Sequence, residues 1–256
     1  MNGQRVVYAV VPECDPAAQT PPATLLQALT STASHEIIEA ATNPGGGAGI
    51  GFYLDGTAQR TRGWADILGG EVADLCVDAF ALGQGHTTEG PYTVTRVWSI
   101  PNATAGRNPC VPVPAGEVYF DAVPSANAVL LDVGQSKTLD VIAMADGPIA
   151  GWTVTAEDWT DPATRYLSFA IAGAQATDAG PALSVKNGDK LSLTVTLLAD
   201  PVASLAGEAD AVLVSTDGTG AAITRAHFWP FVVLTPAAAA DAGVTGMARK
   251  PPRKRR

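Results

Sequence analysis

The second half of the chain contains the pattern that most constrains the fold. From about residue 121 to residue 236, short runs of β-forming residues recur, with Gly-, Pro- and Asn-containing turns between them. In residues 190–198, every second residue from Leu191 is Leu or Val, and the residues between are Ser or Thr, as a strand with one buried face requires. About seven such runs in roughly 110 residues predict a β-sandwich of immunoglobulin or fibronectin type. The runs are 128–133, 137–145, 151–156, 166–171, 190–198, 211–215 and 222–234.

The first half of the chain has a different pattern. We expect a buried strand at 6–11, a helix at 22–42, a long Gly-rich loop at 44–70, a short helix or turn at 71–76 and a strand at 92–98. Because residue 1 is so close to the first strand, we also expect that an N-terminal portion and any leader are missing. The predicted fold class is α+β. It comprises an N-terminal domain at 1–120, a β-sandwich at 121–236 and a disordered Ala-, Pro- and Arg-rich tail at 237–256.

The helix at 22–42 has clear start and stop signals. Pro21 and Pro22 are tolerated in a first turn, alanines favour the helical interior, and Pro44 with the glycines after it ends the helix. Leu25, Leu26 and Leu29 lie roughly along one stripe of this helix.

This helix contains the sequence His35-Glu36-Ile37-Ile38-Glu39. His35 and Glu39 are four residues apart, so they project from one helical face and can share a cation. Glu36 is placed where a general base would flank a metal-bound water. The spacing is that of the His-Glu-x-x-His zinc helix, with a carboxylate in place of the second imidazole, and zinc accepts carboxylate ligands. The alternative is a solvated pair of side chains on a helix.

A catalytic zinc site requires a third protein ligand. The candidates are Glu71, Asp74, His86 and His227. Glu71 and Asp74 would share a face if they were helical, so one could bind the metal while the other accepts a hydrogen bond from His35. Each also has a simpler interpretation: a cap or surface charge for the carboxylates, a loop residue for His86, and strand packing for His227.

Composition and charge exclude some classes of function. The net charge is -9, yet the last eight residues contain six of the sixteen basic side chains. The other residues therefore hold ten basic against 25 acidic groups, a net charge of -15, which argues against nucleic-acid binding by the folded part. No apolar run reaches the roughly 18 residues that a membrane span needs. Three cysteines, Cys14, Cys76 and Cys110, fit one disulfide and one remaining thiol.

Several blocks of residues 6–113 occur in an order that resembles the secreted EXORDIUM-like (phosphate-induced protein) family and related bacterial secreted proteins. The blocks are Ser34-His35-Glu36-Ile37-Ile38-Glu39-Ala40-Ala41-Thr42-Asn43-Pro44, Trp64, Gly70-Glu71-Val72-Ala73-Asp74-Leu75-Cys76, Tyr92-Thr93-Val94-Thr95-Arg96-Val97-Trp98-Ser99 and Cys110-Val111. The chain departs from the pattern at residue 43, which is Asn rather than Asp, and in having little sequence before the first strand.

The resemblance implies a secreted or otherwise extracytoplasmic protein with a partial zincin-like N-terminal domain. It makes His35 and Glu39 ligands of Zn²⁺, Glu36 the base, and Glu71 or Asp74 the remaining ligand. It also implies a disulfide between Cys76 and Cys110, with Cys14 unpaired or linked elsewhere.

Three functional hypotheses follow. The first is a secreted zinc-dependent hydrolase, most simply a metallopeptidase, in which Glu36 activates a zinc-bound water and the sandwich is a targeting module. Its partner would be a peptide or protein substrate. The second is a non-catalytic extracellular interaction or adhesion module that binds a cell wall or surface and has a structural or vestigial metal site. The third is a calcium- or carbohydrate-binding sandwich that uses turn aspartates. These aspartates are Asp146, Asp158, Asp161, Asp189 and Asp217.

Overall fold

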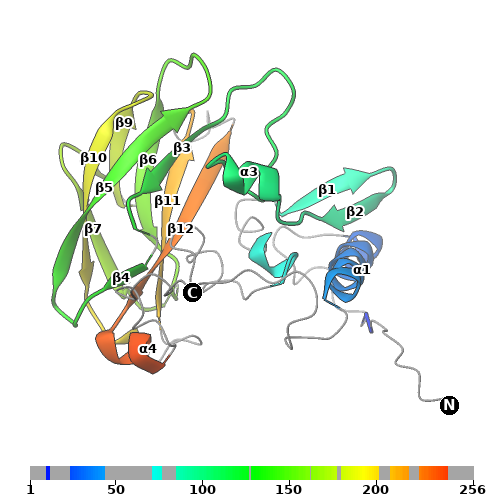
Figure 1. Cartoon of the computed structure of the whole chain (residues 1–256), viewed down its shortest axis with the longest axis horizontal. Helices are drawn as coiled ribbons and strands as arrows, with labels where there is room; N and C mark the ends of the chain where they lie inside the picture. The colour runs from blue at the N-terminus through cyan, green and yellow to red at the C-terminus, as the bar shows by residue number, and fades with distance from the viewer. Residues whose placement is uncertain are drawn as a thin grey trace, which may run out of the picture.

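The computed structural model describes residues 10–11, 24–43, 71–76, 85–126, 128–161, 163–177, 180–201, 208–218 and 225–241. The described fold is α+β and mostly β. Figure 1 shows a β-sandwich on the left and a long helix with a small hairpin on the right. The loop predicted at 44–70, nearly all of the strand predicted at 6–11, and residues 242–256 of the predicted tail lie outside the described residues.

Helix α1 (Leu25–Thr42) begins three residues later than expected, because a capping box sets its start. The Thr24 hydroxyl accepts a hydrogen bond from the Gln27 amide, and the Gln27 side chain accepts one from the Thr24 amide. These bonds satisfy two backbone donors that the first turn would otherwise leave unpaired. At the other end, the amide of the C-cap residue Asn43 donates to the carbonyl of Glu39.

The buried face of α1 is small and polar, so the apolar stripe does not mark the packed side of the helix. Ala28, Ser31 and Glu39 are the buried residues, whereas the Leu25 and Leu26 side chains are 40% and 48% exposed. Small side chains let a strand approach the helix closely. That strand belongs to a hairpin of β1 (His86–Glu89) and β2 (Tyr92–Thr95), which pairs His86 with Thr95.

The sandwich consists of two sheets that pack face to face. A four-stranded sheet has the order β3-β5-β10-β7, and a six-stranded sheet has the order β4-β12-β11-β6-β9-β8. Neighbouring strands are antiparallel except for β4 and β12, which are parallel. The strands are β3 (Phe120–Pro124), β4 (Ala128–Leu130), β5 (Ser136–Ala145), β6 (Trp152–Asp158), β7 (Leu167–Ile171), β8 (Gln175–Thr177), β9 (Gly180–Val185), β10 (Lys190–Leu197), β11 (Ala209–Thr216) and β12 (Ala226–Leu234).

The main core lies between the two sheets, and the alternation predicted for β10 is confirmed there. Its four inward residues, from Leu191 to Leu197, are each no more than 6% exposed.

Strand β12 is instead buried on both faces. Trp229 and Phe231 face the main core, while Phe228 lies in a second cluster on the outer face. Burial on both sides explains why β12 is a continuous apolar run rather than an alternating one.

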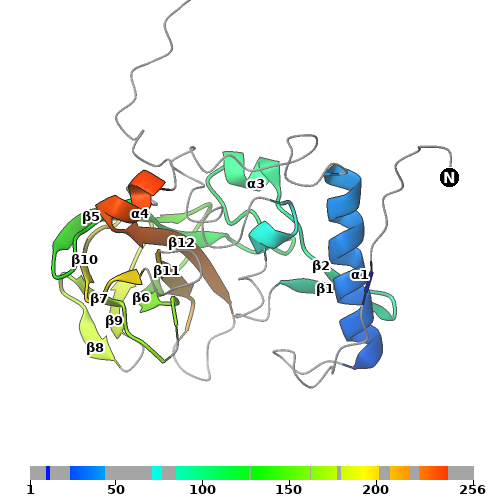
Figure 2. The same cartoon turned by 90° about the horizontal axis from the view of Figure 1, so that it is seen from below.

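The outer face of the six-stranded sheet is where the N-terminal part docks. Val212, Val214 and Phe228 of the sheet form an apolar cluster with Val72, Leu75, Trp98 and the Cys76–Cys110 disulfide. Helix α3 (Ile100–Thr104) contributes Ala103 to its margin. Figure 2 shows α1 at the far side of this contact, roughly upright beside the sandwich. The N-terminal part and the sandwich therefore share apolar surface.

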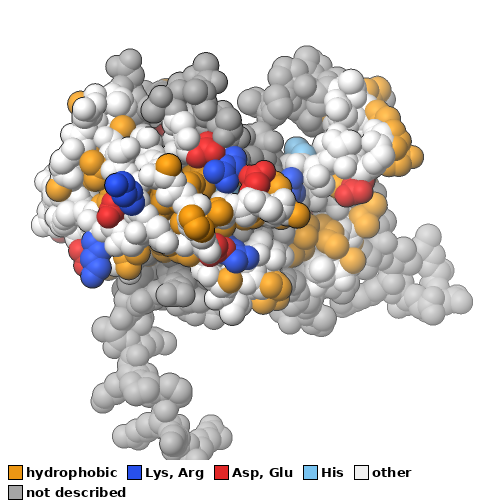
Figure 3. All heavy atoms as spheres, turned by 90° about the horizontal axis from the view of Figure 1, so that it is seen from above, with side chains coloured by type: hydrophobic (Ala, Val, Ile, Leu, Met, Phe, Trp, Pro, Cys, Tyr) orange, Lys and Arg blue, Asp and Glu red, His pale blue; other side chains and the backbone are white. Residues whose placement is uncertain are grey.

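The described elements differ from the predicted ones in several places. The described residues of the sandwich form ten strands rather than about seven, because β3, β8 and β9 were not predicted. Helix α4 (Pro236–Asp241) occupies the start of the predicted tail and places Ala239 against Val232 and Leu234. In the view of Figure 3, Lys and Arg side chains lie beside Asp and Glu over the sandwich. Among the described helices, none is both long enough and apolar enough to cross a membrane.

Candidate metal centre

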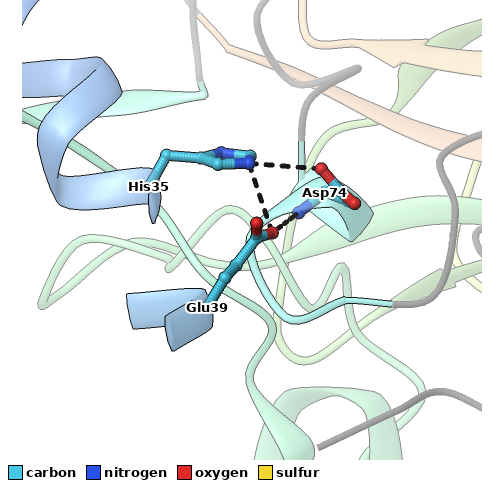
Figure 4. Close-up of side chains that lie close together, drawn as sticks. All are labelled: His35, Glu39 and Asp74. Atoms are coloured by element: carbon cyan, nitrogen blue, oxygen red, sulfur yellow. Dashed lines mark hydrogen bonds and ion pairs between the residues drawn. The ribbon is translucent and has the colours of Figure 1, made fainter. Parts of the chain in front are cut away.

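Helix α1 and the turn at residues 71–76 bring three predicted residues together. His35 and Glu39 project from one face of α1, and Asp74 is the first residue of a single 3₁₀ turn at 74–76. His35 Nε2 lies 3.2 Å from Glu39 Oε1 and 3.2 Å from Asp74 Oδ1. The Asp74 amide donates to Glu39 Oε1 at 3.2 Å. Figure 4 shows the three side chains converging on one point, which we call the His35–Glu39–Asp74 cluster.

The other candidate residues take different positions. The Glu71 carboxylate accepts a hydrogen bond from the Asn43 side chain, so it borders the cluster without contributing to it. Glu36 is exposed on α1, beside His35 in the sequence. His227 is buried in the sandwich between the rings of Tyr119 and Phe120, with centroid distances of 4.8 and 5.0 Å. The strand-packing interpretation of His227 is therefore the one that its surroundings favour.

The hairpin holds one side of the site against α1. The amides of Thr93 and Thr95 donate to the hydroxyls of Thr30 and Ser34 at 3.1 and 2.8 Å. The Thr95 hydroxyl in turn donates to the Ser31 carbonyl at 3.2 Å, so the Thr95 side chain faces the helix. The hydroxyls of Thr30 and Ser34, four residues apart on α1, therefore accept hydrogen bonds from alternate amides of β2.

His86 lies on the same side of the hairpin as this contact. It is the cross-strand partner of Thr95, and directly opposed residues of an antiparallel pair project to the same face. Its side chain therefore points toward α1 near His35. Partial burial and the charge of His35 both lower the pKa of His86, which favours its neutral form. A neutral imidazole beside the cluster is a potential further metal ligand.

The turn that carries Asp74 is fixed by packing and by the disulfide. Leu75 and Cys76 are fully buried, and Cys76 is bonded to Cys110. The Trp98 amide donates to the Val72 carbonyl at 3.0 Å, which ties the same turn to the segment after β2. The disulfide that the resemblance implied is therefore present, two residues from Asp74.

The cluster gathers more negative charge than one imidazole can balance. The hydrogen bond from His35 to Asp74 is the main cause that raises the pKa of His35, and it outweighs the opposite effect of burial. Burial raises the pKa of Glu39 to about 7, and the charge of His35 only partly opposes this. A bound cation would replace the proton on Glu39.

The spacing of the three donor atoms can be compared with that of zinc ligands. Zinc bonds to imidazole nitrogen and carboxylate oxygen are about 2.0–2.2 Å, so two ligands at neighbouring corners of a tetrahedron lie about 3.3–3.6 Å apart. The two His35–carboxylate distances of 3.2 Å are close to that edge length, and all three donor atoms lie within 4.8 Å of one another. One nitrogen and two oxygens also form a donor set that zinc accepts.

Asn43 and Arg96 make side-chain contacts that the sequence did not predict. Asn43 had been noted only as a departure from the family pattern, and it positions Glu71. Arg96 follows β2, and its Nε donates to the His86 carbonyl at 3.1 Å. The sequence signal for Arg96 was that a cationic residue follows an alternating strand, which by itself suggests only a surface charge.

Comparisons with known proteins do not identify this chain. No family model matches it, and no curated protein matches it. Among solved structures, it is similar to a conjugative transposon lipoprotein from Bacteroides eggerthii DSM 20697, with 13% identity and a TM-score of 0.33. The match covers 44% of this chain and 95% of that one. A likeness this low carries no argument about fold or function.

Proposed function

We propose that the His35–Glu39–Asp74 cluster binds zinc and that the chain is a secreted, zincin-like hydrolase, most simply a metallopeptidase. The observation that carries the proposal is the convergence of three donor atoms from two separate segments at spacings close to a zinc tetrahedron. The blocks that resemble the EXORDIUM-like family support it, since they include all three residues.

The residues around the cluster have distinct roles in this proposal. Bound zinc would polarise a scissile carbonyl and acidify a water. Glu36 is exposed and adjacent to His35, so it can accept a proton at the solvent side of the cluster. Glu71, whose carboxylate accepts a hydrogen bond from Asn43, adds negative charge near Glu39. The sandwich would target the enzyme to its substrate or to a surface.

The same contacts also favour a second candidate function. The Asp74 amide donates to Glu39 Oε1, and His35 contacts both carboxylates, so the cluster ties α1 to the 71–76 turn without any metal. Such a link would suit a non-catalytic extracellular interaction module whose metal site is structural or vestigial. Metal content and hydrolysis separate the two candidates.

The first experiment is metal content of the purified full chain, measured by elemental mass spectrometry after zinc is offered. We expect about one zinc per chain in the wild type and in Asp140→Asn, an exposed sandwich aspartate that serves as the control. His35→Ala and Asp74→Asn should lose the zinc, because each removes one of three ligands. A wild-type protein that takes up no zinc would refute the metal centre.

The second experiment tests hydrolysis with peptide libraries. Glu36→Gln should reduce the rate roughly 10²–10⁴-fold while zinc content is kept, as expected for loss of a general base. Glu89→Gln, an exposed residue of β1, is the matched control and should behave as wild type. Zinc binding without hydrolysis of any library would reject the peptidase and favour the interaction module.

A further inference from the structure

An open hollow of about 480 Å³ lies between the edges of the two sheets of the sandwich. Strand β7 is an edge of the four-stranded sheet, and β8, beside β9, is an edge of the six-stranded sheet. Figure 2 shows these three strands together on the side of the sandwich away from α1. The lining combines the buried residues Ala156 and Leu167 and the partly buried Phe169 with polar side chains. This volume and this mixture of groups are typical of a ligand site.

The free edge of β7 faces the hollow. The amide and carbonyl of Leu197 both bond to the segment before β5, so its cross-strand partner Leu167 directs its own N–H and C=O away from β10. The Leu167 amide donates to the Asp158 carboxylate at 2.8 Å, and its carbonyl accepts from Arg165 Nε at 3.1 Å. Asp158 and Arg165 both line the hollow. Phe169 is two residues further along β7, so its N–H and C=O point to the same side.

This edge is open at a single residue. Side chains close it at Leu167, and the Ile171 carbonyl accepts from the Ala174 amide at 3.0 Å. Within the part of the chain that the structure describes, neither the N–H nor the C=O of Phe169 has a hydrogen-bond partner. An exposed strand edge pairs with another extended chain, and one open residue can exchange two hydrogen bonds with one residue of a ligand.

The charged groups around the hollow offer donors rather than acceptors. The Asp158 carboxylate accepts four hydrogen bonds, both oxygens of Glu157 accept one each, and Asp161 accepts one from a backbone amide. The Arg165 guanidinium uses only its Nε, and no carboxylate of the described residues forms an ion pair with it. Its remaining N–H groups are suited to a carboxylate, which guanidinium binds in a bidentate manner.

We propose that this hollow binds a short extended peptide segment, which pairs with the backbone of Phe169 and places a carboxylate on Arg165. Because Arg165 is bonded to Leu167, two residues from Phe169, the carboxylate belongs to a side chain within about two residues of the paired one. The inference does not depend on the metal centre. It gives the sandwich a targeting role with a defined class of partner, an acidic polypeptide in extended conformation.

The test titrates peptides into the full ¹⁵N-labelled chain and follows amide signals by nuclear magnetic resonance. The first peptide is acetyl-Thr-Val-Asp-Val-Thr-amide. The second has Lys in place of Asp, and the third is the acidic peptide with N-methyl groups on its three central amides. A neutral oligosaccharide is titrated separately. The wild type is compared with Arg165→Gln, Arg165→Lys and Arg96→Gln, and the thermal midpoint of each variant is measured to detect a loss of folding. Arg96 is a matched control, because its Nε also donates to a backbone carbonyl, that of His86 at 3.1 Å, but in the hairpin.

We expect the acidic peptide to shift the Phe169 amide signal of the wild type in a saturable way. Affinity should be at least about tenfold weaker for the Lys peptide and in Arg165→Gln, as for a lost hydrogen bond between charged groups. Arg165→Lys should keep part of the affinity, Arg96→Gln should keep all of it, and the N-methylated peptide should leave the Phe169 signal unchanged. Equal affinities for the acidic and Lys peptides, or for the acidic peptide and its N-methylated form, would overturn the proposal. So would a response to the oligosaccharide alone, or no response to any peptide.

Discussion

The disulfide between Cys76 and Cys110 should support both the stability of the N-terminal part and the position of Asp74. The perturbation is the double substitution Cys76→Ala and Cys110→Ala. The two residues are 34 apart in the sequence, and the loop-closure relation for that length predicts a loss of about 4 kcal/mol in the free energy of unfolding. Both cysteines are buried in the apolar cluster on the six-stranded sheet, so the missing sulfurs add a cavity cost of roughly 1 kcal/mol.

The same change should weaken zinc binding, because Asp74 lies two residues before Cys76 in the same turn. Loss of a group that positions a ligand typically lowers metal affinity by about 10–100-fold. We expect the lower end of that range, since burial of Leu75 and the hydrogen bond from Trp98 to Val72 still hold the turn.

The assay combines urea unfolding, followed by far-ultraviolet circular dichroism, with zinc affinity from competition against a chromophoric chelator. Cys14→Ala is the control, because it removes the third cysteine and leaves the disulfide intact. A double variant that loses less than about 1 kcal/mol and binds zinc like the wild type would refute the reasoning. Lower stability with unchanged zinc affinity would show that packing alone positions Asp74.

Three further predictions concern the sandwich and its contact with the N-terminal part. Burial raises the pKa of Asp121 from 3.8 to about 7, so the folded protein retains a proton that the unfolded chain releases. The free energy of unfolding should therefore fall as pH rises from about 4 to about 7, and urea titrations at pH 5 and 8 should show a smaller fall in Asp121→Asn. Gly180→Ala should destabilise the protein more than Gly188→Ala, since both glycines have positive φ but only at Gly180 would a Cβ lie 2.7 Å from the Ala156 carbonyl oxygen. We expect about 1–2 kcal/mol of strain at both positions and roughly 1–3 kcal/mol more at Gly180, measured by urea unfolding. Asn108→Ala should cost roughly 2–4 kcal/mol in the same assay, because its fully buried side chain accepts two backbone amides that would lose their partner.

Each of these predictions has an outcome that would contradict it. Equal pH dependence in the wild type and Asp121→Asn would mean that Asp121 is ionised in the folded protein throughout this range. Equal losses for the two glycine variants would mean that β9 can move away from β6. A loss below about 1 kcal/mol for Asn108→Ala would imply that water replaces its side-chain oxygen.

Local patterns predicted much of the architecture. The period-two alternation of β10 depends only on which face is buried, and a stop at Asn43 and Pro44 follows from backbone chemistry. The i, i+4 spacing of His35 and Glu39 likewise required nothing beyond a helix, and the two side chains do meet at 3.2 Å. The sequence predicts too early a start for α1, because Pro21 and Pro22 suggest a first turn, whereas the capping box begins at Thr24.

Other elements were missed because their sequence signals are ambiguous. Strand β8 is exposed along its whole length, so it has no apolar alternation, and the Gly180-Pro181 pair that opens β9 usually marks a turn. Strand β3 contains a fully buried aspartate, which a hydrophobic pattern does not predict. Hydrogen bonds from Tyr119, Ser215 and the Ala122 amide are what make that burial possible.

The sequence by itself determined that α1 presents a histidine and a glutamate on one face, because helical spacing is a local property. It also determined an alternating, sandwich-forming second half. Only the tertiary structure brought Asp74, rather than Glu71, to His35, since the 71–76 segment is a turn rather than a regular helix and sends the two carboxylates to different partners, His35 and Asn43. That outcome depends on a contact between segments distant in the sequence, which no local pattern encodes.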